Sequence, residues 1–290
     1  MTKRLWNIFR FFIISGLVFI IIYPMIYMLS CSFRDSIDMN DPSVMWIPRH
    51  FTFDIIKQTA EVMELPETLL NTVLLNLGCS VVQVMACAVT GYGFARFDFF
   101  GKKFLFGIVI MMIIVPPQII SLPLYGNFVH LKLINSKLAM YLPALAGNGI
   151  RSGLMIFIFR QFFKGLPKEI EDSAYIDGCS RFRAFVSVML PNAGSAVLTV
   201  FLFSVVFYWN DYYISSTFFT DNQTIALMIK NLGSRLSVKL FNNSAVQVSP
   251  REQIVWLEAG CLISVTPMLV MYIFLQRYFI EGIERSGIVG

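Results

Sequence analysis

Few side chains in this sequence are suited to acid–base or metal chemistry within its apolar segments. Asp211 is the one carboxylate that lies well inside such a segment, and neither His50 nor His130 does. The five cysteines show no CxxC or CxxH spacing, which a zinc site or a redox pair would need. An enzyme embedded in these segments would need facing carboxylates, a metal pair or a nucleophile with its base. We therefore expect no catalytic residue and no metal site on this chain.

Acidic residues gather instead in a polar stretch of the chain that separates two apolar segments. Pro167 suits the first position of a helix, because the N–H that it lacks would be unpaired there in any case. Glu169, Glu171 and Asp172 then place negative charge in the first turns, where the helix dipole favours it. The stretch thus begins with a short helix.

Gly178 breaks that first helix, and a second one follows. Ser180 can cap the second helix, which we expect over 181–189 and ending before Pro191. A helix pair this short is marginal on its own, so we expect it to dock against a partner protein as a rigid body, with Asp172 meeting a basic group. The simpler alternative is an ordered connector in which Asp172 is an ordinary first-turn acid.

The composition indicates where these helices must be anchored. Of 290 residues, 56% are hydrophobic and only 14% are charged, whereas a soluble domain carries about 25% charged residues. Such a chain is a membrane protein, and lipid is one of its partners. The net charge of +5 is scattered between apolar runs and forms no stripe of the kind that binds nucleic acid.

Six segments are long and apolar enough to cross a membrane, and they lie at 11–31, 69–95, 104–124, 138–159, 195–219 and 259–275. Backbone polar groups in lipid must be bonded within the chain, so these segments are expected to be helices. The first is too long for a signal peptide and lacks a small-x-small cleavage site. The expected fold is all-α and polytopic, with six transmembrane helices.

The distribution of positive charge sets the expected orientation of these helices. With a cytoplasmic N-terminus, the segments on the inner side hold 13 lysines and arginines, and the longer outer segments hold 9. Positive residues favour the cytoplasmic side. Both termini are therefore expected in the cytoplasm.

Several polar and aromatic residues lie within or near the apolar segments. Amides suit sugar hydroxyls, and aromatic rings can stack on a pyranose face, but bonding between helices explains such residues equally well. An arginine within a membrane span is energetically costly. Arg151 therefore either lines a substrate pathway or extends its side chain outward to the membrane interface. The candidates for a substrate pathway are Asn71, Asn76, Arg151, Tyr208, Trp209, Asn210 and Asp211.

The spacing of the polar stretch resembles a known family. Binding-protein-dependent ABC permeases carry a cytoplasmic signature of Glu-Ala-Ala, three residues, Gly, nine residues and Ile-x-Leu-Pro. This chain has Asp172-Ser173-Ala174, three residues, Gly178, nine residues and Val188-Met189-Leu190-Pro191. The spacing agrees throughout, with aspartate for glutamate, serine for alanine and valine for isoleucine.

Further matches narrow the resemblance to carbohydrate permeases. Trp209-Asn210-Asp211 resembles their tryptophan-asparagine-acid triplet, and Gln276-Arg277-Tyr278-Phe279 resembles the end of their last span. The small tail that ends at Gly290 also fits. The chain is most similar to the shorter, six-span subunit of the maltose-type importer.

The resemblance implies a type I ABC importer permease (MetI-like) fold with an N-terminal helix and external loop at 1–68, a permease core at 69–280 and a cytoplasmic tail at 281–290. It implies a bacterial cytoplasmic membrane location and three partners, which are a second permease subunit in a heterodimer, an ABC ATPase dimer and an extracytoplasmic sugar-binding protein. The chain itself would carry no cofactor, since ATP and Mg²⁺ would bind the ATPase.

The resemblance also assigns a role to the helix pair, which would be the coupling element that contacts the ATPase. The residues expected there are Glu171, Asp172, Ser173, Ala174, Tyr175, Asp177, Gly178, Leu190 and Pro191. The solute expected is a sugar or oligosaccharide. An amino-acid or peptide permease of the same class, and an ion-coupled secondary transporter, remain the alternatives.

Overall fold

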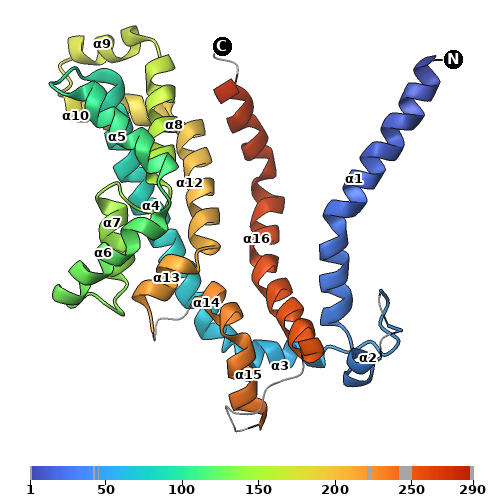
Figure 1. Ribbon diagram of the computed structural model, residues 1–290. Coiled ribbons are helices and arrows are strands. Elements are labelled where there is room, and N and C mark those ends of the chain that lie inside the picture. Colours follow the sequence, from blue (N-terminus) through green and yellow to red (C-terminus); the bar gives the residue numbers. More distant parts are fainter. Residues whose placement is uncertain (1, 42, 45, 221–223, 242–249, 288–290) are drawn as a thin grey trace. The chain divides into compact units, whose positions relative to one another are not determined.

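The computed structural model describes residues 2–41, 43–44, 46–220, 224–241 and 250–287. Within these residues the regular structure is helical, apart from one isolated bridge between Arg34 and Phe51. The expected all-α fold is confirmed for this part of the chain (Figure 1). Two compact units are present, one formed by 1–66 with 228–269 and the other by 67–227 with 270–290.

The first unit contains the N-terminal helix and the segments that follow it. Its helices are α1 (Thr2–Ser32), α2 (Ser36–Asn40), α3 (Asp54–Val62), α15 (Leu232–Phe241) and the first part of α16 (Pro250–Gly287). A Cβ atom at Gly260 of α16 would lie 3.1 Å from Leu232 Cδ2. Glycine therefore lets α16 and α15 pack closely.

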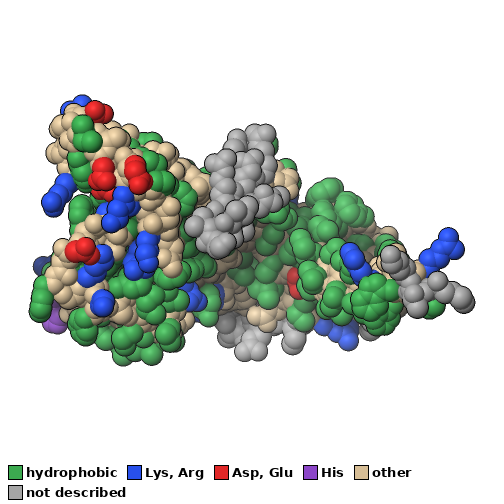
Figure 2. All heavy atoms as spheres, turned by 90° about the horizontal axis from the view of Figure 1, so that it is seen from above, with side chains coloured by type: hydrophobic (Ala, Val, Ile, Leu, Met, Phe, Trp, Pro, Cys, Tyr) green, Lys and Arg blue, Asp and Glu red, His purple; other side chains and the backbone are tan. Residues whose placement is uncertain are grey.

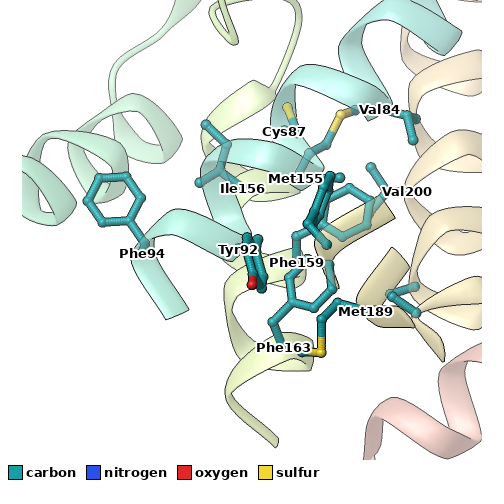
Figure 3. Packing of buried hydrophobic residues seen from close by; sticks show 14 of the residues in the cluster. Val84, Cys87, Tyr92, Phe94, Met155, Ile156, Phe159, Phe163, Met189 and Val200 are labelled. Atoms are coloured by element: carbon teal, nitrogen blue, oxygen red, sulfur yellow. The ribbon is translucent and has the colours of Figure 1, made fainter. Parts of the chain in front are cut away.

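The second unit holds the helices that position the candidate site. They are α4 (Leu65–Arg96), α5 (Lys102–Ile114), α6 (Pro117–His130), α7 (Leu138–Leu145), α8 (Ser152–Gly165), α9 (Lys168–Ile176), α10 (Arg181–Ala184), η1 (Phe185–Met189), α11 (Leu190–Asn192), α12 (Gly194–Trp209) and α13 (Tyr213–Phe218). Of α14 (Ile225–Lys230), residues 225–227 belong to the second unit and the rest to the first. Phe159, Phe163 and Met189 are fully buried and lie beside Tyr92 (Figure 3). This aromatic core joins α4, α8 and η1.

Among the described residues, three helices are long and apolar enough to cross a membrane by themselves, at Arg4–Ser32, Leu65–Arg96 and Arg251–Gln276. Two bent pairs raise the number to five, with α5 and α6 meeting at 103° and 181–192 meeting α12 at 80°. The segment expected at 138–159 is divided into α7 and α8 by residues 146–151. The structure thus bears out several apolar helices, and a sixth crossing depends on joining α7 to α8.

The expectation that the second loop helix ends before Pro191 is wrong. The helix passes through Pro191 into α11, because residues Phe185–Met189 form a π-helix just ahead of it. Proline lacks an N–H, and its ring crowds the carbonyl four residues earlier. A wider π turn removes that conflict.

The C-terminal segment continues as helix. Helix α16 extends to Gly287, so the segment expected as a tail from 281 is helical as far as that residue. The last three residues, 288–290, lie outside the described part of the chain.

Candidate functional site

The joint between α9 and α10 is built around Gly178. Helix α9 ends at Ile176, and Gly178 follows two residues later with φ +83°, the left-handed region that glycine enters without strain. Gly178 N–H donates to Tyr175 O at 3.0 Å, and Cys179 N–H donates to Ala174 O at 2.9 Å. These two bonds form a Schellman motif, which closes a helix. The break expected at this glycine is confirmed.

The second helix of the pair begins at a serine cap. Ser180 Oγ accepts a hydrogen bond from Arg183 N–H at 3.3 Å, as the sequence predicts. Such a cap satisfies one of the first N–H groups of the helix. With the Schellman motif on one side and the cap on the other, the angle between α9 and α10 is locally determined.

Glu171 fixes α9 to the rest of the second unit. Its side chain is buried, and Oε1 accepts hydrogen bonds from Tyr92 Oη at 2.5 Å and Tyr175 Oη at 2.6 Å. Burial, followed by this bond to Glu171, raises the pKa of Tyr175 above its ordinary value. The phenol therefore stays neutral and remains a donor to the carboxylate.

Arg96, the last residue of α4, balances the charge of Glu171. Arg96 Nε lies 3.1 Å from Glu171 Oε2, and both side chains are buried. The contact is an ion pair rather than an aligned hydrogen bond, since Nε has no hydrogen-bond partner within the described residues. Arg96 Nη2 also donates to Leu166 O at 2.8 Å. Arg96 thus holds the end of α8 and the first turns of α9 together.

The opposite face of the pair is open. Asp172, Ser173 and Asp177 are exposed, as are the apolar side chains of Ile176, which is 85% exposed, and Phe182, which is 74% exposed. Figure 2 looks down on the end where α9 and α10 lie and shows acidic, basic and hydrophobic side chains side by side there. Large exposed apolar side chains rimmed by charge are typical of a docking surface.

The other residues expected in the coupling element lie further inside. Ala174 is buried, Tyr175 and Leu190 are half-buried, and Pro191 is exposed. The structure therefore brings Asp172, Ile176 and Phe182 to the surface of the pair, while Glu171 and Ala174 face the protein interior.

Two of the pathway candidates make bonds between helices. Asn76 is buried, and its Nδ2 donates to Val205 O at 2.9 Å, which links α4 to α12. Tyr208 Oη donates to Gln83 Oε1 at 2.5 Å, and Gln83 Nε2 donates in turn to Ile150 O at 2.7 Å. These side chains hold three segments of the second unit together.

The triplet at 209–211 contains the last residue of α12 and precedes α13. Asp211 accepts from Ile214 N–H at 3.1 Å and Ser215 N–H at 2.8 Å, so it caps the first turn of α13. Asn210 Nδ2 donates to Val206 O at 2.9 Å. Trp209 is buried, and Asn71, near the start of α4, is half-buried.

Arg151 differs from these residues. It immediately precedes α8, has φ +58° and is exposed. It lines a cavity of about 90 Å³ together with Asn148, Ser121 and Tyr208. Of the candidates for a substrate pathway, Arg151 and Tyr208 are the two that line this cavity.

With this geometry established, comparison with known proteins places the chain in a family. The family model described as "Binding-protein-dependent transport system inner membrane component" matches residues 87–285. The chain belongs to this family. The matched region includes α9, α10 and the Schellman motif at Gly178 that lies between them.

Curated relatives align with nearly the whole chain. The arabinooligosaccharides transport system permease protein AraQ of Halalkalibacterium halodurans is 29% identical over 277 residues, 94% of this chain and 93% of the relative. The polygalacturonan/rhamnogalacturonan transport system permease protein YtcP of Bacillus subtilis is 23% identical and covers 100% of both chains. The lactose transport system permease protein LacG of Rhizobium radiobacter is 24% identical over 99% of this chain and 98% of its own.

A solved structure confirms the fold of this inner membrane component. A chain of a bacterial ABC transporter involved in the import of the acidic polysaccharide alginate superposes with a TM-score of 0.78. The two chains share 19% identity, and the match covers 96% of this chain and 98% of the other. The expected ABC importer permease fold is confirmed.

Sequence reasoning missed two residues of this inner membrane component, Tyr92 and Arg96. A signal was present, since Tyr92 and Arg96 are four residues apart, as are Glu171 and Tyr175, and such pairs share one face of a helix. The pattern could not show that the two faces meet. That contact depends on how α4 and α9 pack.

Proposed function

We propose that this chain is a membrane subunit of a bacterial ABC importer that translocates a sugar or an oligosaccharide by alternating access. A separate ATPase dimer binds ATP and Mg²⁺ and supplies the energy. A second permease subunit completes the pathway as a heterodimer, and an extracytoplasmic binding protein delivers the sugar.

One observation carries this proposal. The α9–α10 pair is tied to α4 through Glu171 and Arg96, while Ile176 and Phe182 stand exposed beside Asp172. A rigid body with an apolar, acidic tip suits a cleft on a moving partner, because its displacement passes directly to α4. The coupling residues proposed on the open face are Asp172, Ser173, Ile176, Asp177 and Phe182.

The proposed solute class rests on the relatives. Their names refer to arabinooligosaccharides, to lactose and to polygalacturonan/rhamnogalacturonan. All of these are sugars, although some are neutral and some carry carboxylates. The relatives therefore support carbohydrate import and leave the charge of the substrate open.

Uptake by cells tests the solute class. Cells that make the full importer should take up labelled oligosaccharides, and removal of this chain alone should abolish that uptake, with restoration by the chain supplied in trans. Loss of amino-acid or peptide uptake with unchanged sugar uptake would favour the alternative permease class. ATP-independent uptake driven by an ion gradient would indicate a secondary transporter.

The docking face is tested by a matched pair of variants. Ile176 is 85% exposed and Ile47, in the first unit, is 80% exposed. Ile176→Glu should release the ATPase from the purified complex, because it places a charge in an apolar contact. Ile47→Glu should leave the ATPase bound. Equal retention of the ATPase in both variants would argue against α9 as the docking helix.

A further inference from the structure

Arg151 lies at the start of α8, at the opposite end of that helix from the polar α9–α10 pair, and its side chain is exposed. Arg96 Nη2 bonds to Leu166 O, so the ends of α4 and α8 lie at one level, beside the polar α9–α10 pair. The 14 residues of α8 span about 21 Å, which separates Arg151 from the end of α8 at that level. The hydrocarbon layer of a membrane is about 30 Å thick. The length of α8 that separates Arg151 from the polar end is thus shorter than the thickness of that layer.

A second route, along α4, gives a similar distance from the polar end. Gln83 Nε2 bonds to Ile150 O at 2.7 Å, next to Arg151. Thirteen residues of helix separate Gln83 from Arg96, which corresponds to about 20 Å. Arginine within a span marks a functional site by default, since a permanent charge there needs a polar environment or a counter-charge.

The backbone at Arg151 is held in an unusual conformation. Its φ of +58° lies in the left-handed region, which non-glycine residues seldom adopt. Glycine, asparagine or aspartate would be more usual there. Strained positions of this kind cluster at functional sites, where the surrounding structure maintains them. The conformation starts α8 and leaves Arg151 lining the cavity.

The cavity itself has the chemistry of a small subsite. About 90 Å³ is the liquid volume of roughly three water molecules, enough for one substituent such as a carboxylate rather than for a whole oligosaccharide. Its walls are mostly apolar, and Asn148, Ser121 and Tyr208 supply polar groups. No ion pair joins Arg151 to a carboxylate among the described residues.

We propose that Arg151 and this cavity form a subsite on this subunit for the carboxylate of an acidic sugar. The inference rests on the proposed function in sugar import. A guanidinium is always charged and pairs with a carboxylate through two parallel hydrogen bonds. Neutral hydroxyls would leave its charge unbalanced, whereas a uronic acid would neutralise it.

Uptake by cells with the complete importer tests the subsite, with labelled trigalacturonate as the acidic probe and arabino-, gluco- and galacto-trisaccharides as neutral probes. Arg151→Asn removes the charge while keeping a residue that tolerates positive φ. It should slow trigalacturonate uptake by about tenfold or more, the loss expected for a charge-assisted hydrogen bond. Arg151→Lys should retain part of the activity. The control Arg251→Asn removes an exposed arginine of α16 and should have no effect.

The other outcomes overturn the subsite. They are wild-type uptake of neutral sugars only, an Arg151→Asn variant that transports trigalacturonate normally, and equal loss of acidic and neutral uptake. Dissociation of the second permease from Arg151→Asn would show that Arg151 pairs with that subunit instead. If the wild-type importer took up none of these sugars, the proposed function in sugar import would be refuted together with the subsite. Failure of the subsite alone would leave the uptake of neutral sugars intact, so the two failures are distinguishable.

Discussion

Arg96 of α4 and Glu171 of α9 form a buried ion pair, with Arg96 Nε 3.1 Å from Glu171 Oε2. Asp172, the next residue along the chain, points outward and is exposed. Two neighbouring acids on one short helix therefore have different surroundings. One is bonded within the subunit, and the other is available to a partner.

Removal of Glu171 should destabilise the subunit. A broken buried pair costs about 3–5 kcal/mol, because it leaves an uncompensated charge. Glu171→Ala should lower the melting temperature of the purified complex and reduce its yield, whereas Asp172→Ala should leave the melting temperature near wild type. In the double variant Glu171→Leu with Arg96→Met, both charges are absent, so much of the loss should be recovered. A melting temperature unchanged by Glu171→Ala would contradict a structural role for the pair.

Replacement of Asp172 should uncouple ATP hydrolysis from transport. An exposed pair is worth only about 0.2–1 kcal/mol, but a pair enclosed by a partner is worth more. Asp172→Ala should weaken sugar-stimulated ATP hydrolysis, Asp172→Glu should be tolerated, and Asp172→Lys should be worst because it would oppose the basic group expected on the ATPase. Glu169→Ala, also exposed on α9, is the control. Normal transport by Asp172→Lys would exclude the docking role.

Substitution of Gly178 should abolish transport while sugar capture by the binding protein stays intact. The space around Gly178 is open, so the cost comes from its φ of +83° rather than from a clash. A side chain there costs about 1–2 kcal/mol or changes the angle of the helix pair. Gly178→Leu should therefore fail and Gly178→Asn should retain more uptake.

Gly194 supplies the matched control for this joint. It also has open space around it, and it has no positive φ. Gly194→Ala should transport as wild type does. If Gly178→Leu and Gly194→Ala behaved alike, the left-handed joint would have no special part in coupling.

The positive-charge bias predicts that both termini are cytoplasmic. Reporter fusions at Gly290 and within 221–250 should then report opposite sides of the membrane. Fusions within 160–194 should report the same side as Gly290, because the proposed coupling role of α9 and α10 requires them to reach an ATPase in the cytoplasm. If the reporters at Gly290 and within 221–250 lay on the same side, the six-span arrangement would be overturned.

Acid should loosen the segment that follows α1. Asp38 accepts hydrogen bonds from Arg49 N–H at 2.7 Å and His50 N–H at 2.8 Å. Burial acts to raise its pKa, but the bonds from His50 and Arg49 outweigh burial and leave the pKa of Asp38 below its ordinary value. A lowered folded-state pKa contributes stability above the unfolded value of about 3.9, and that stability is lost as pH falls through the folded value.

Thermal unfolding against pH measures this contribution. Asp38→Asn should be less stable than wild type between about pH 5 and 7. The difference should shrink as pH falls below about 4, because Asp38 is protonated first in the unfolded chain and then, at its lower folded-state pKa, in the folded chain. A difference that is independent of pH would mean that the Asp38 charge does not hold the loop.

The amino-acid sequence by itself determined the membrane class, the helical fold and the glycine joint. The composition determines whether the surface of the chain is suited to water or to lipid. Gly178 and Ser180 act through hydrogen bonds to residues a few positions away, so the glycine joint needs no contact with distant parts of the sequence. The family spacing at 172–191 likewise lies within one stretch. Sequence reasoning went wrong at Pro191, where a π-helix lets the helix continue.

Only the tertiary structure decided which acid faces inward. Successive residues on a helix point about 100° apart, so either Glu171 or Asp172 could have met α4. Glu171 is the acid that faces inward because it meets Tyr92 and Arg96. Both residues lie far away in the sequence and are brought beside α9 by the packing of α4 against α8. The same holds for Asn76, whose amide donates to Val205 O, because side-chain partners across helices follow from packing and not from local spacing.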